Sequence, residues 1–362
     1  MDFIVSHFKR LDWILIITAM LLSGIGLVFL YSSCLGGGDF YDFQKQFIFL
    51  LIGISLMFGA SFFDWRNLKE DSRLILVLYF ICIAALAGIL LFAPEIRGIK
   101  AWYKIGPVSF DPIEITKIVL VILLAKYFSN RHIEMYRARH IILSGFYFLF
   151  PILLIFFHPD LGSVLILSVL WLGMLIVSGI PLRHFLALLA CAVLAFSLCW
   201  ATVLKDYQRE RILSFVNPID PLGMSWNQNQ AKIAIGSGGV WGQGIGKGSQ
   251  TQYGFLPETR TDFIFASIAE ETGLAGVGVL LSLFFILLWR IIKISLLSEN
   301  NFSRLFSAGI AILIVSQIFI HIGMNIGLLP IIGISLPFVS YGGSGLIMFF
   351  LAIGILQSIR MR

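Results

Sequence analysis

The sequence predicts an all-α polytopic membrane protein with ten transmembrane helices and one large extracytoplasmic loop between helices 7 and 8. Composition is the first observation: of 362 residues, 58% are hydrophobic and 13% charged. With a mean hydropathy of +0.93, this balance excludes a soluble globular protein. The second observation is that apolar runs near the ~20 residues that cross a hydrocarbon core recur along the whole chain. The third is a single long polar segment, residues 205–261, that interrupts them.

The ten apolar runs are separated by short polar connections. They cover residues 13–33, 44–63, 74–93, 110–128, 141–157, 160–179, 185–204, 263–289, 304–327 and 337–358. The first run follows Lys9 and Arg10 but is long and lacks a small-residue cleavage pattern. We therefore expect a retained helix and not a removed signal peptide. The whole chain, residues 1–362, is expected to form one integral membrane domain.

The distribution of Lys and Arg predicts that both termini are cytoplasmic. With the N-terminus inside, the inside segments hold fifteen of these residues, and the short outside segments hold only four, Lys45, Arg97, Lys100 and Lys104. Short cytoplasmic loops carry the excess of positive charge in membrane proteins. The loop 205–261 is then extracytoplasmic. The net charge of +6 therefore comes mainly from the cytoplasmic Lys and Arg residues, whose natural partner is the anionic lipid surface. We expect no nucleic-acid partner.

The loop 205–261 is rich in glycine but carries no nucleotide-binding fingerprint. Its glycine clusters at 236–239 and 242–248 match neither the dinucleotide pattern nor the P-loop, and no strand precedes them. Structural turns and close backbone approach to another surface are both open interpretations. A connection of this length is far beyond the ordinary, which favours a function for it.

The sequence contains no zinc or redox motif. His321, within the ninth predicted span, is interpreted as a hydrogen-bonded packing residue, and His158 alone gives a weak signal. The cysteines lack metal-ligand and redox spacing and are interpreted as small apolar residues. They are Cys34, Cys82, Cys191 and Cys199.

Glu114 and Lys117 lie near the start of the fourth predicted span. Their i, i+3 spacing places them on one helix face, where they can neutralise each other. A structural ion pair is one interpretation. The other is a site for an anionic headgroup, because Arg97 and Lys100 add outside positive charge beside Trp102.

Asp160 stands at the outside turn between the fifth and sixth predicted spans, directly after Pro159. Proline can start a helix, and Asp favours the positively polarised helix N-terminus. Helix capping and substrate binding are both open for this residue.

Asp262 is the strongest candidate for a chemical role. It lies two residues after Arg260, at the mouth of an apolar helix, where charges are expensive and usually mean chemistry or transport. The helix dipole and Arg260 favour its ionised form, whereas burial opposes it. An ionised carboxylate at a cavity mouth can act as a general base. Capping is the alternative, although Thr259 or Thr261 is an equally good cap.

Two further polar groups follow in the sequence. Glu270 lies eight residues after Asp262, about 12 Å along a helix and about 80° round it, within reach of one elongated cavity. Glu271 points nearly opposite to Asp262. Ser340 opens the tenth span in a run of small residues, for which close helix packing is favoured over direct substrate contact.

Several motifs, in this order, resemble the SEDS family of bacterial membrane glycosyltransferases, named for shape, elongation, division and sporulation. They are the region 97–117 ending in DPIEITK, HPDLG at 158–162, AIGSGG at 234–239, PETRTDFIF at 257–265, EETG at 270–273, and GISLPF with SYGGS between 333 and 344. The resemblance covers nearly the whole chain. The segments 217–223 and 246–258 resemble the elongation members more than the division members.

The sequence departs from the family pattern in two places. The family usually has Gln-Pro-Ser-Glu where DPIE stands at 111–114, and Gln where His158 stands. Roles for Asp111 and His158 are therefore not carried over. The charged residues that do match the family pattern are Glu114, Lys117, Asp160 and Asp262.

The resemblance implies polymerisation of lipid II into peptidoglycan at the outer face of the bacterial cytoplasmic membrane. Asp262 would accept the proton of the attacking sugar hydroxyl. Cations would stabilise the departing pyrophosphate, the candidates being Arg97, Lys117, Arg209, Arg211 and Arg260. A divalent cation, Mg²⁺ or Mn²⁺, held by carboxylates is a further candidate. The family also implies a class B penicillin-binding protein as partner.

Two rival interpretations are a lipid II flippase and a noncatalytic scaffold of the wall-synthesis complex. Paired intramembrane charges also mark translocation paths. A flippase is expected to have its essential charges near the membrane midplane. Asp262, Asp160 and Glu114 are instead predicted at the outer ends of their helices, which favours an enzyme.

Overall fold

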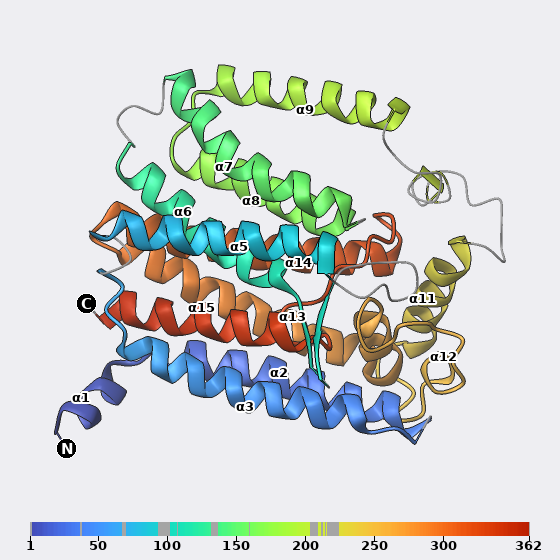
Figure 1. Ribbon diagram of the computed structural model, residues 1–362. Coiled ribbons are helices and arrows are strands. Elements are labelled where there is room, and N and C mark those ends of the chain that lie inside the picture. The colour runs from blue at the N-terminus through green and yellow to red at the C-terminus, as the bar shows by residue number, and fades with distance from the viewer. Residues whose placement is uncertain are drawn as a thin grey trace.

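The computed structural model of the protein describes residues 2–36, 38–66, 70–92, 102–106, 108–131, 137–158, 160–202, 209–210, 213, 215 and 224–361. Each of the ten predicted spans overlaps one helix (Figure 1). These helices are α2 (Trp13–Leu35), α3 (Tyr41–Phe62), α5 (Ser72–Phe92), α6 (Pro112–Ser129), α7 (Ala138–Phe157), α8 (Leu161–Val177), α9 (Leu182–Thr202), α13 (Ile264–Leu297), α14 (Asn301–Ile326) and α15 (Gly343–Met361).

The structure confirms a helical membrane protein. In the described part of the chain, eight of these helices are long and apolar enough to cross a membrane. The two others are α8, an apolar helix of 17 residues, and α6, which carries Glu114, Lys117 and Lys126. Both pack against α14 inside the bundle. Ten membrane crossings therefore stay a prediction.

The bundle is organised around α14. This helix packs against α6, α8 and α13, while α15 lies along α3 on the other side of the core (Figure 1). At the edge of the bundle, α9 buries none of its residues. Apolar side chains without protein neighbours are expected on a helix that faces lipid, where hydrocarbon replaces the protein core as solvent.

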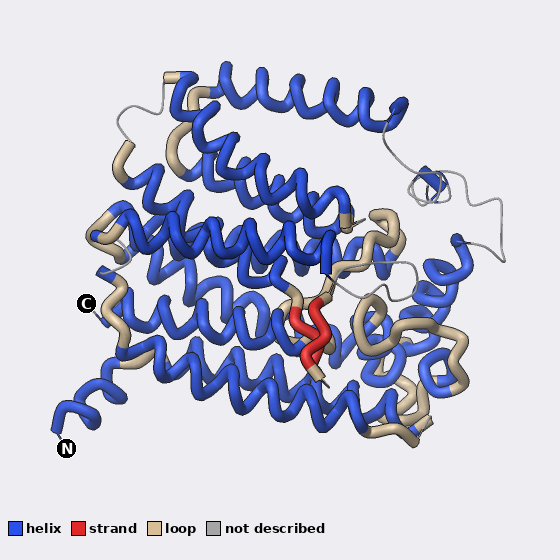
Figure 2. Tube along the Cα trace, in the orientation of Figure 1, coloured by secondary structure: helices blue, strands red, loops and turns tan. Residues whose placement is uncertain are grey.

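The two ends of the bundle differ. The N- and C-termini lie at one end, and α11 (Met224–Gly238) and α12 (Ser249–Gln252) lie at the other (Figure 1). A hairpin of β1 (Tyr103–Ile105) and β2 (Val108–Phe110) precedes α6, and β2 contacts α15 (Figure 2). A short amphipathic helix, α1 (Asp2–Arg10), precedes α2.

The predicted loop 205–261 is partly helical. Within its described portion, α11 packs against α13 and α14 and buries Ala231 and Ala234 completely. Helix α11 was not predicted from the sequence, because its fully buried residues are alanines and its other positions are largely polar. Only large apolar side chains give a strong helical period.

The eighth predicted span, 263–289, differs from the structure because α13 breaks at Gly273, where φ is 66° and ψ is −166°. The amides of residues 274–275 donate to the carbonyls of residues 239–240 at 2.9 and 3.1 Å. The carbonyls of residues 270–271 accept from the amides of residues 243–244 at 3.0 and 2.9 Å. The loop thus satisfies the backbone groups that the break exposes, and only glycine adopts this conformation readily.

Helix α2 is fastened to α13 at the end of the bundle that holds the termini. Asp12, whose side chain accepts from the amide of Leu15 at 3.2 Å, is almost fully buried. Its carboxylate also accepts from Nε of Arg290 at 2.9 Å. A buried charge requires such a partner, because an unpaired carboxylate away from water is strongly destabilising.

Candidate active site

Asp262 lies directly before α13, on a turn that starts at Glu258. Glu258 adopts a φ of 45°, and its carbonyl accepts from the amides of Thr261 and Phe263 at 3.1 and 3.2 Å. A non-glycine residue in this left-handed region costs about 1–3 kcal/mol and persists only where its surroundings hold it. Phe263 occupies the N-cap of α13 and makes no side-chain cap. Asp262 therefore precedes the cap position on a constrained turn.

Gly333 brings a second chain segment to Asp262. A Cβ atom on this glycine, which has a φ of +71°, would lie 3.6 Å from Oδ2 of Asp262. The preceding carbonyl, that of Ile332, would lie 2.8 Å from a Cβ atom on Gly162 in the first turn of α8. The segment 332–333 therefore contacts both Asp262 and the helix that Asp160 precedes.

Asp160 caps α8, since its Oδ1 accepts from the amide of Ser163 at 3.0 Å. The capping interpretation is confirmed for one oxygen of this carboxylate. The side chain is half-buried, so capping does not close it to other contacts. Beside it, His158 is almost fully buried, and its two ring nitrogens make no hydrogen bond within the described residues.

Glu114 and Lys117 form the predicted ion pair, with Nζ and Oε1 2.6 Å apart. The Lys117 side chain is only 3% exposed, against 13% for Glu114. Asp111 precedes them as the N-cap of α6 and accepts from the amide of Ile113 at 2.9 Å.

Arg260 pairs with a residue that the sequence analysis missed. Its Nη1 lies 2.6 Å from Oδ2 of Asp42 in the first turn of α3, and both side chains are partly exposed. Asp42 gave no signal beyond an acidic residue at a helix start, which dipole compensation explains equally well. The pair keeps the Arg260 guanidinium at the same end of the bundle as Asp262.

Ser340 holds backbone and not substrate. Its hydroxyl donates to the carbonyl of Thr261 at 2.9 Å and accepts from the amide of Leu336 at 2.8 Å. The side chain is buried. Direct substrate contact by Ser340, which packing already outweighed in the sequence, is therefore not favoured.

Glu270 also serves the fold. Its fully buried carboxylate accepts from the amides of Gln250 and Thr251 at 2.7 and 3.0 Å and from the hydroxyl of Thr251 at 2.7 Å. Glu271 beside it accepts from the hydroxyl of Ser32 in α2 at 2.6 Å. Both glutamates thus anchor the 242–253 loop, and the structure offers no free oxygen of Glu270 to a substrate cavity.

Three predicted cation positions remain. Arg97 and Arg211 lie outside the residues that the structure describes. Nη2 of Arg209 donates to the carbonyl of Ala201, near the end of α9, at 3.4 Å. The structure therefore brings Arg260 to the Asp262 turn and leaves the other arginines of the predicted set without a shown place there.

The described residues contain no group of three or more His, Cys, Asp or Glu side chains that could hold a metal ion. The carboxylates nearest the site already have partners, Lys117 for Glu114 and a helix amide for Asp160. A divalent cation here would need ligands from substrate phosphates and water, as Mg²⁺ commonly has.

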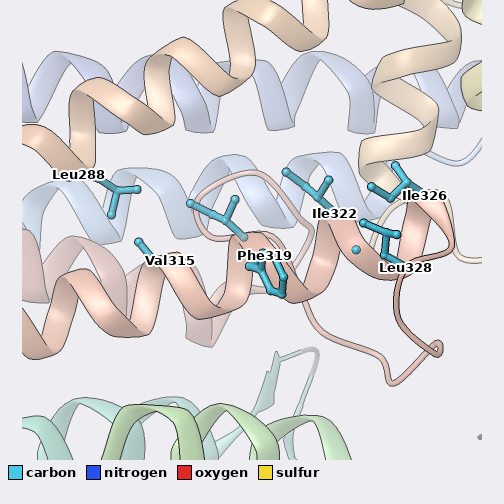
Figure 3. Close-up of a pocket in the computed structure, with 8 residues that line it drawn as sticks. Leu288, Val315, Phe319, Ile322, Ile326 and Leu328 are labelled. Atoms are coloured by element: carbon cyan, nitrogen blue, oxygen red, sulfur yellow. The ribbon is translucent and has the colours of Figure 1, made fainter. Parts of the chain in front are cut away.

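An apolar groove runs between α13 and α14. Its volume is about 330 Å³, and Figure 3 shows labelled lining side chains that include Val315, Phe319 and Ile322. Every residue that lines it is apolar or glycine. A sugar or pyrophosphate needs convergent polar groups, so this groove does not hold those parts of a substrate.

The fold and the site define a polytopic membrane protein with a carboxylate and cations at one end of its helix bundle. The chain belongs to the SEDS family, because residues 12–362 match the sequence profile of the FtsW, RodA and SpoVE family, described as cell cycle protein. The predicted family is thus confirmed.

Relatives with assigned functions agree with this. The chain is 38% identical over 283 residues to the peptidoglycan glycosyltransferase MrdB of Escherichia coli strain K12, covering 78% of this chain and 76% of that protein. It is 33% identical over 361 residues to stage V sporulation protein E of Bacillus subtilis strain 168, covering 96% of each.

Solved structures share the fold. A chain of a peptidoglycan synthase complex that coordinates polymerization and crosslinking is 30% identical, with a TM-score of 0.82 and 97% of each chain covered. The rod shape determining protein RodA of Thermus thermophilus is 28% identical, with a TM-score of 0.72, and the match covers 97% of this chain and 96% of that one.

Proposed function

We propose that this protein is a peptidoglycan glycosyltransferase that polymerises lipid II into glycan strands for cell elongation and shape. The observation that carries the proposal is the placement of Asp262. This carboxylate stands on a constrained turn directly before α13, two residues after the Arg260 that pairs with Asp42. Relatives over most of the chain bear the name peptidoglycan glycosyltransferase.

The proposed reaction uses Asp262 as a general base. A sugar hydroxyl of one substrate attacks C1 of the sugar that carries the pyrophosphate-lipid group. The new C1–O bond forms while the C1–O bond to pyrophosphate breaks. The hydroxyl proton passes to the Asp262 carboxylate, and the bonding electron pair leaves with the polyprenyl pyrophosphate. Such proton transfer typically contributes ~10²–10⁴-fold to the rate.

Preorganised cations stabilise the negative charge that develops on the leaving group. Arg260 and Lys117 are the candidates that form ion pairs in the structure, and Lys117 is the more buried of the two. A charge in a buried site interacts more strongly than one in water. Arg97, Arg209 and Arg211 complete the proposed set. A divalent cation, Mg²⁺ or Mn²⁺, bound mainly by substrate phosphates is part of the same proposal.

The proposed setting is the bacterial cytoplasmic membrane, with both termini in the cytoplasm and the Asp262 end at the outer face. The asymmetry of Lys and Arg supports this orientation. The whole chain, residues 1–362, would act as one membrane domain, with the 205–261 segment on the outside.

A class B penicillin-binding protein is the proposed partner. The similarity to a chain of a peptidoglycan synthase complex that coordinates polymerization and crosslinking supports an assembly of this kind. Co-purification in mild detergent is expected to recover a stoichiometric complex. Full polymerase activity without such a complex, across several detergents and nanodiscs, would remove the partner from the proposal.

The decisive experiment compares wild-type protein with Asp262→Asn on labelled lipid II in detergent. The amide keeps the size of the side chain but accepts no proton, so the rate is expected to fall at least ~10²-fold. Glu299→Gln is the matched control, because it removes an exposed carboxylate just beyond the C-terminal end of α13, the helix that Asp262 precedes. Wild-type polymerisation by Asp262→Asn would refute the general base. A flippase would form no polymer in either variant.

A further inference from the structure

Three consecutive carbonyls of the Asp262 turn each accept a hydrogen bond from the C-terminal part of the chain. The amide of Tyr341 donates to the carbonyl of Arg260 at 2.9 Å, and the hydroxyl of Ser340 donates to the carbonyl of Thr261 at 2.9 Å. The third donor is Nδ2 of Asn325, which donates to the carbonyl of Asp262 itself at 2.9 Å. The backbone on which the carboxylate stands is therefore held at every peptide.

Asn325 makes more of these contacts than a packing residue needs. It is fully buried in the last turn of α14. Nδ2 donates a second time, to the carbonyl of His321 at 2.8 Å, and Oδ1 accepts from the amide of Ala266 at 3.2 Å. Both donors of the side-chain amide and its oxygen are thus engaged.

The bond to Ala266 supplies a missing cap. The first four amides of a helix lack partners within it, and Phe263 at the N-cap of α13 supplies no side-chain acceptor. Asn325 reaches from α14 to satisfy one of these amides. The same side chain therefore fixes the carbonyl of Asp262 and the first turn of the helix that follows it.

The backbone around Asp262 is strained, and the hydrogen bonds to it oppose its relaxation. In the described residues, the non-glycine positions with positive φ are Glu258, at 45°, and Phe338, at 65°. Glu258 starts the Asp262 turn, and Phe338 lies in the segment that donates to it. Such conformations persist only when neighbouring contacts hold them, so loss of the Asn325 bonds is expected to let the turn relax.

We infer that Asn325 is a positioning residue that aims the Asp262 carboxylate through its own backbone. The inference rests on the proposed function, in which Asp262 is the base. A misplacement of 1 Å can cost about 10²-fold in rate. Asn325 touches no substrate in this scheme, so its loss acts on kcat and leaves KM for lipid II nearly unchanged.

The test measures kcat, KM and thermal stability for Asn325→Ala and the isosteric Asn325→Asp. We expect kcat to fall 10–100-fold in both, with KM within about twofold of wild type. In Asn325→Asp the introduced carboxyl donates only when protonated, so the ratio of variant to wild-type kcat is expected to rise as pH falls. A purely structural role would not give that ratio a pH dependence.

The matched control is Gln317→Leu. Gln317 lies two turns earlier on α14, is also fully buried, and neither of its amide atoms makes a hydrogen bond within the described residues. Its loss is expected to leave kcat unchanged. An equal fall in kcat for Gln317→Leu would reduce the Asn325 effect to a general disturbance of the helix and overturn the inference.

A double variant separates this inference from the proposed function. If Asn325 acts through Asp262, Asn325→Ala is expected to cause no further loss in an Asp262→Ala background. If the Asp262→Asn protein is inactive and the Asn325→Asp protein has wild-type kcat, the positioning role is refuted and the proposed base is not. If the Asp262→Asn protein is active, the proposed general base is refuted, and the positioning role that depends on it is refuted with it. If Asn325→Ala does not fold, Asn325→Asp and hydrogen exchange of the 258–266 backbone, expected to rise in the variant, decide the question.

Discussion

At the residue scale, the site shows how one carboxylate differs from another. Asp160 and Asp111 each accept a bond from a helix amide. Glu270 is surrounded by donors. Asp262 stands before a cap position, and its backbone is held from outside its own helix. The same functional group thus serves capping, anchoring and the proposed base chemistry, because the surrounding donors differ.

The individual roles of site residues were only partly predictable. The Glu114–Lys117 pair and the Asp160 cap follow from local spacing, because helix geometry fixes residues three or four apart. Asp42 and Asn325 were not predictable, because their partners lie 218 and 63 positions away. No local pattern encodes such contacts. Glu270 was assigned to a cavity for the same reason: the residues that cover it come from the loop.

At the element scale, the interrupted helix α13 and its loop form one unit. The break at Gly273 exposes backbone groups that residues 239–244 satisfy. Composition predicted an apolar run at 263–289, and α13 overlaps that run but continues to Leu297. Each of the other predicted spans also overlaps a helix, because hydrophobic runs are set by membrane thickness. The break was not predictable, since a single glycine in an apolar run is also common in continuous membrane helices.

Glu270→Gln tests whether this residue anchors the loop or binds substrate. The amide would present a donor where Gln250 and Thr251 already donate, and an unsatisfied buried group costs about 1–3 kcal/mol. We expect a lower unfolding temperature with KM for lipid II close to wild type. The opposite pattern, unchanged stability with a raised KM, would restore the predicted substrate contact. Glu299→Gln again serves as the control.

At the scale of the whole molecule, the bundle has one end with both termini and one with α11, α12 and the Asp262 turn (Figure 1). The charge count across predicted loops, fifteen against four, predicts that the first end faces the cytoplasm. This prediction rests on charges spread along the whole sequence and not on any single contact.

Labelling of introduced cysteines checks the orientation. Tyr253 is 78% exposed and lies just after α12, so an impermeant maleimide is expected to label Tyr253→Cys in intact spheroplasts. Glu299→Cys, at the other end of the bundle, is expected to react only after lysis. Reversal of the two results would invert the topology.

The hydrogen bonds between α2 and α13 have a consequence for how the helices can move. Asp12 binds Arg290 near one end of α13, and Ser32 binds Glu271 near the other. Twenty residues separate Asp12 from Ser32, roughly 30 Å at 1.5 Å per residue, close to the thickness of the hydrocarbon core. Because α2 is hydrogen-bonded to α13 on both sides of the Gly273 break, we expect α2 to move together with both parts of α13. We therefore expect a lipid tail to enter beside helices with few buried contacts, of which α9, with no buried residue, is the clearest example.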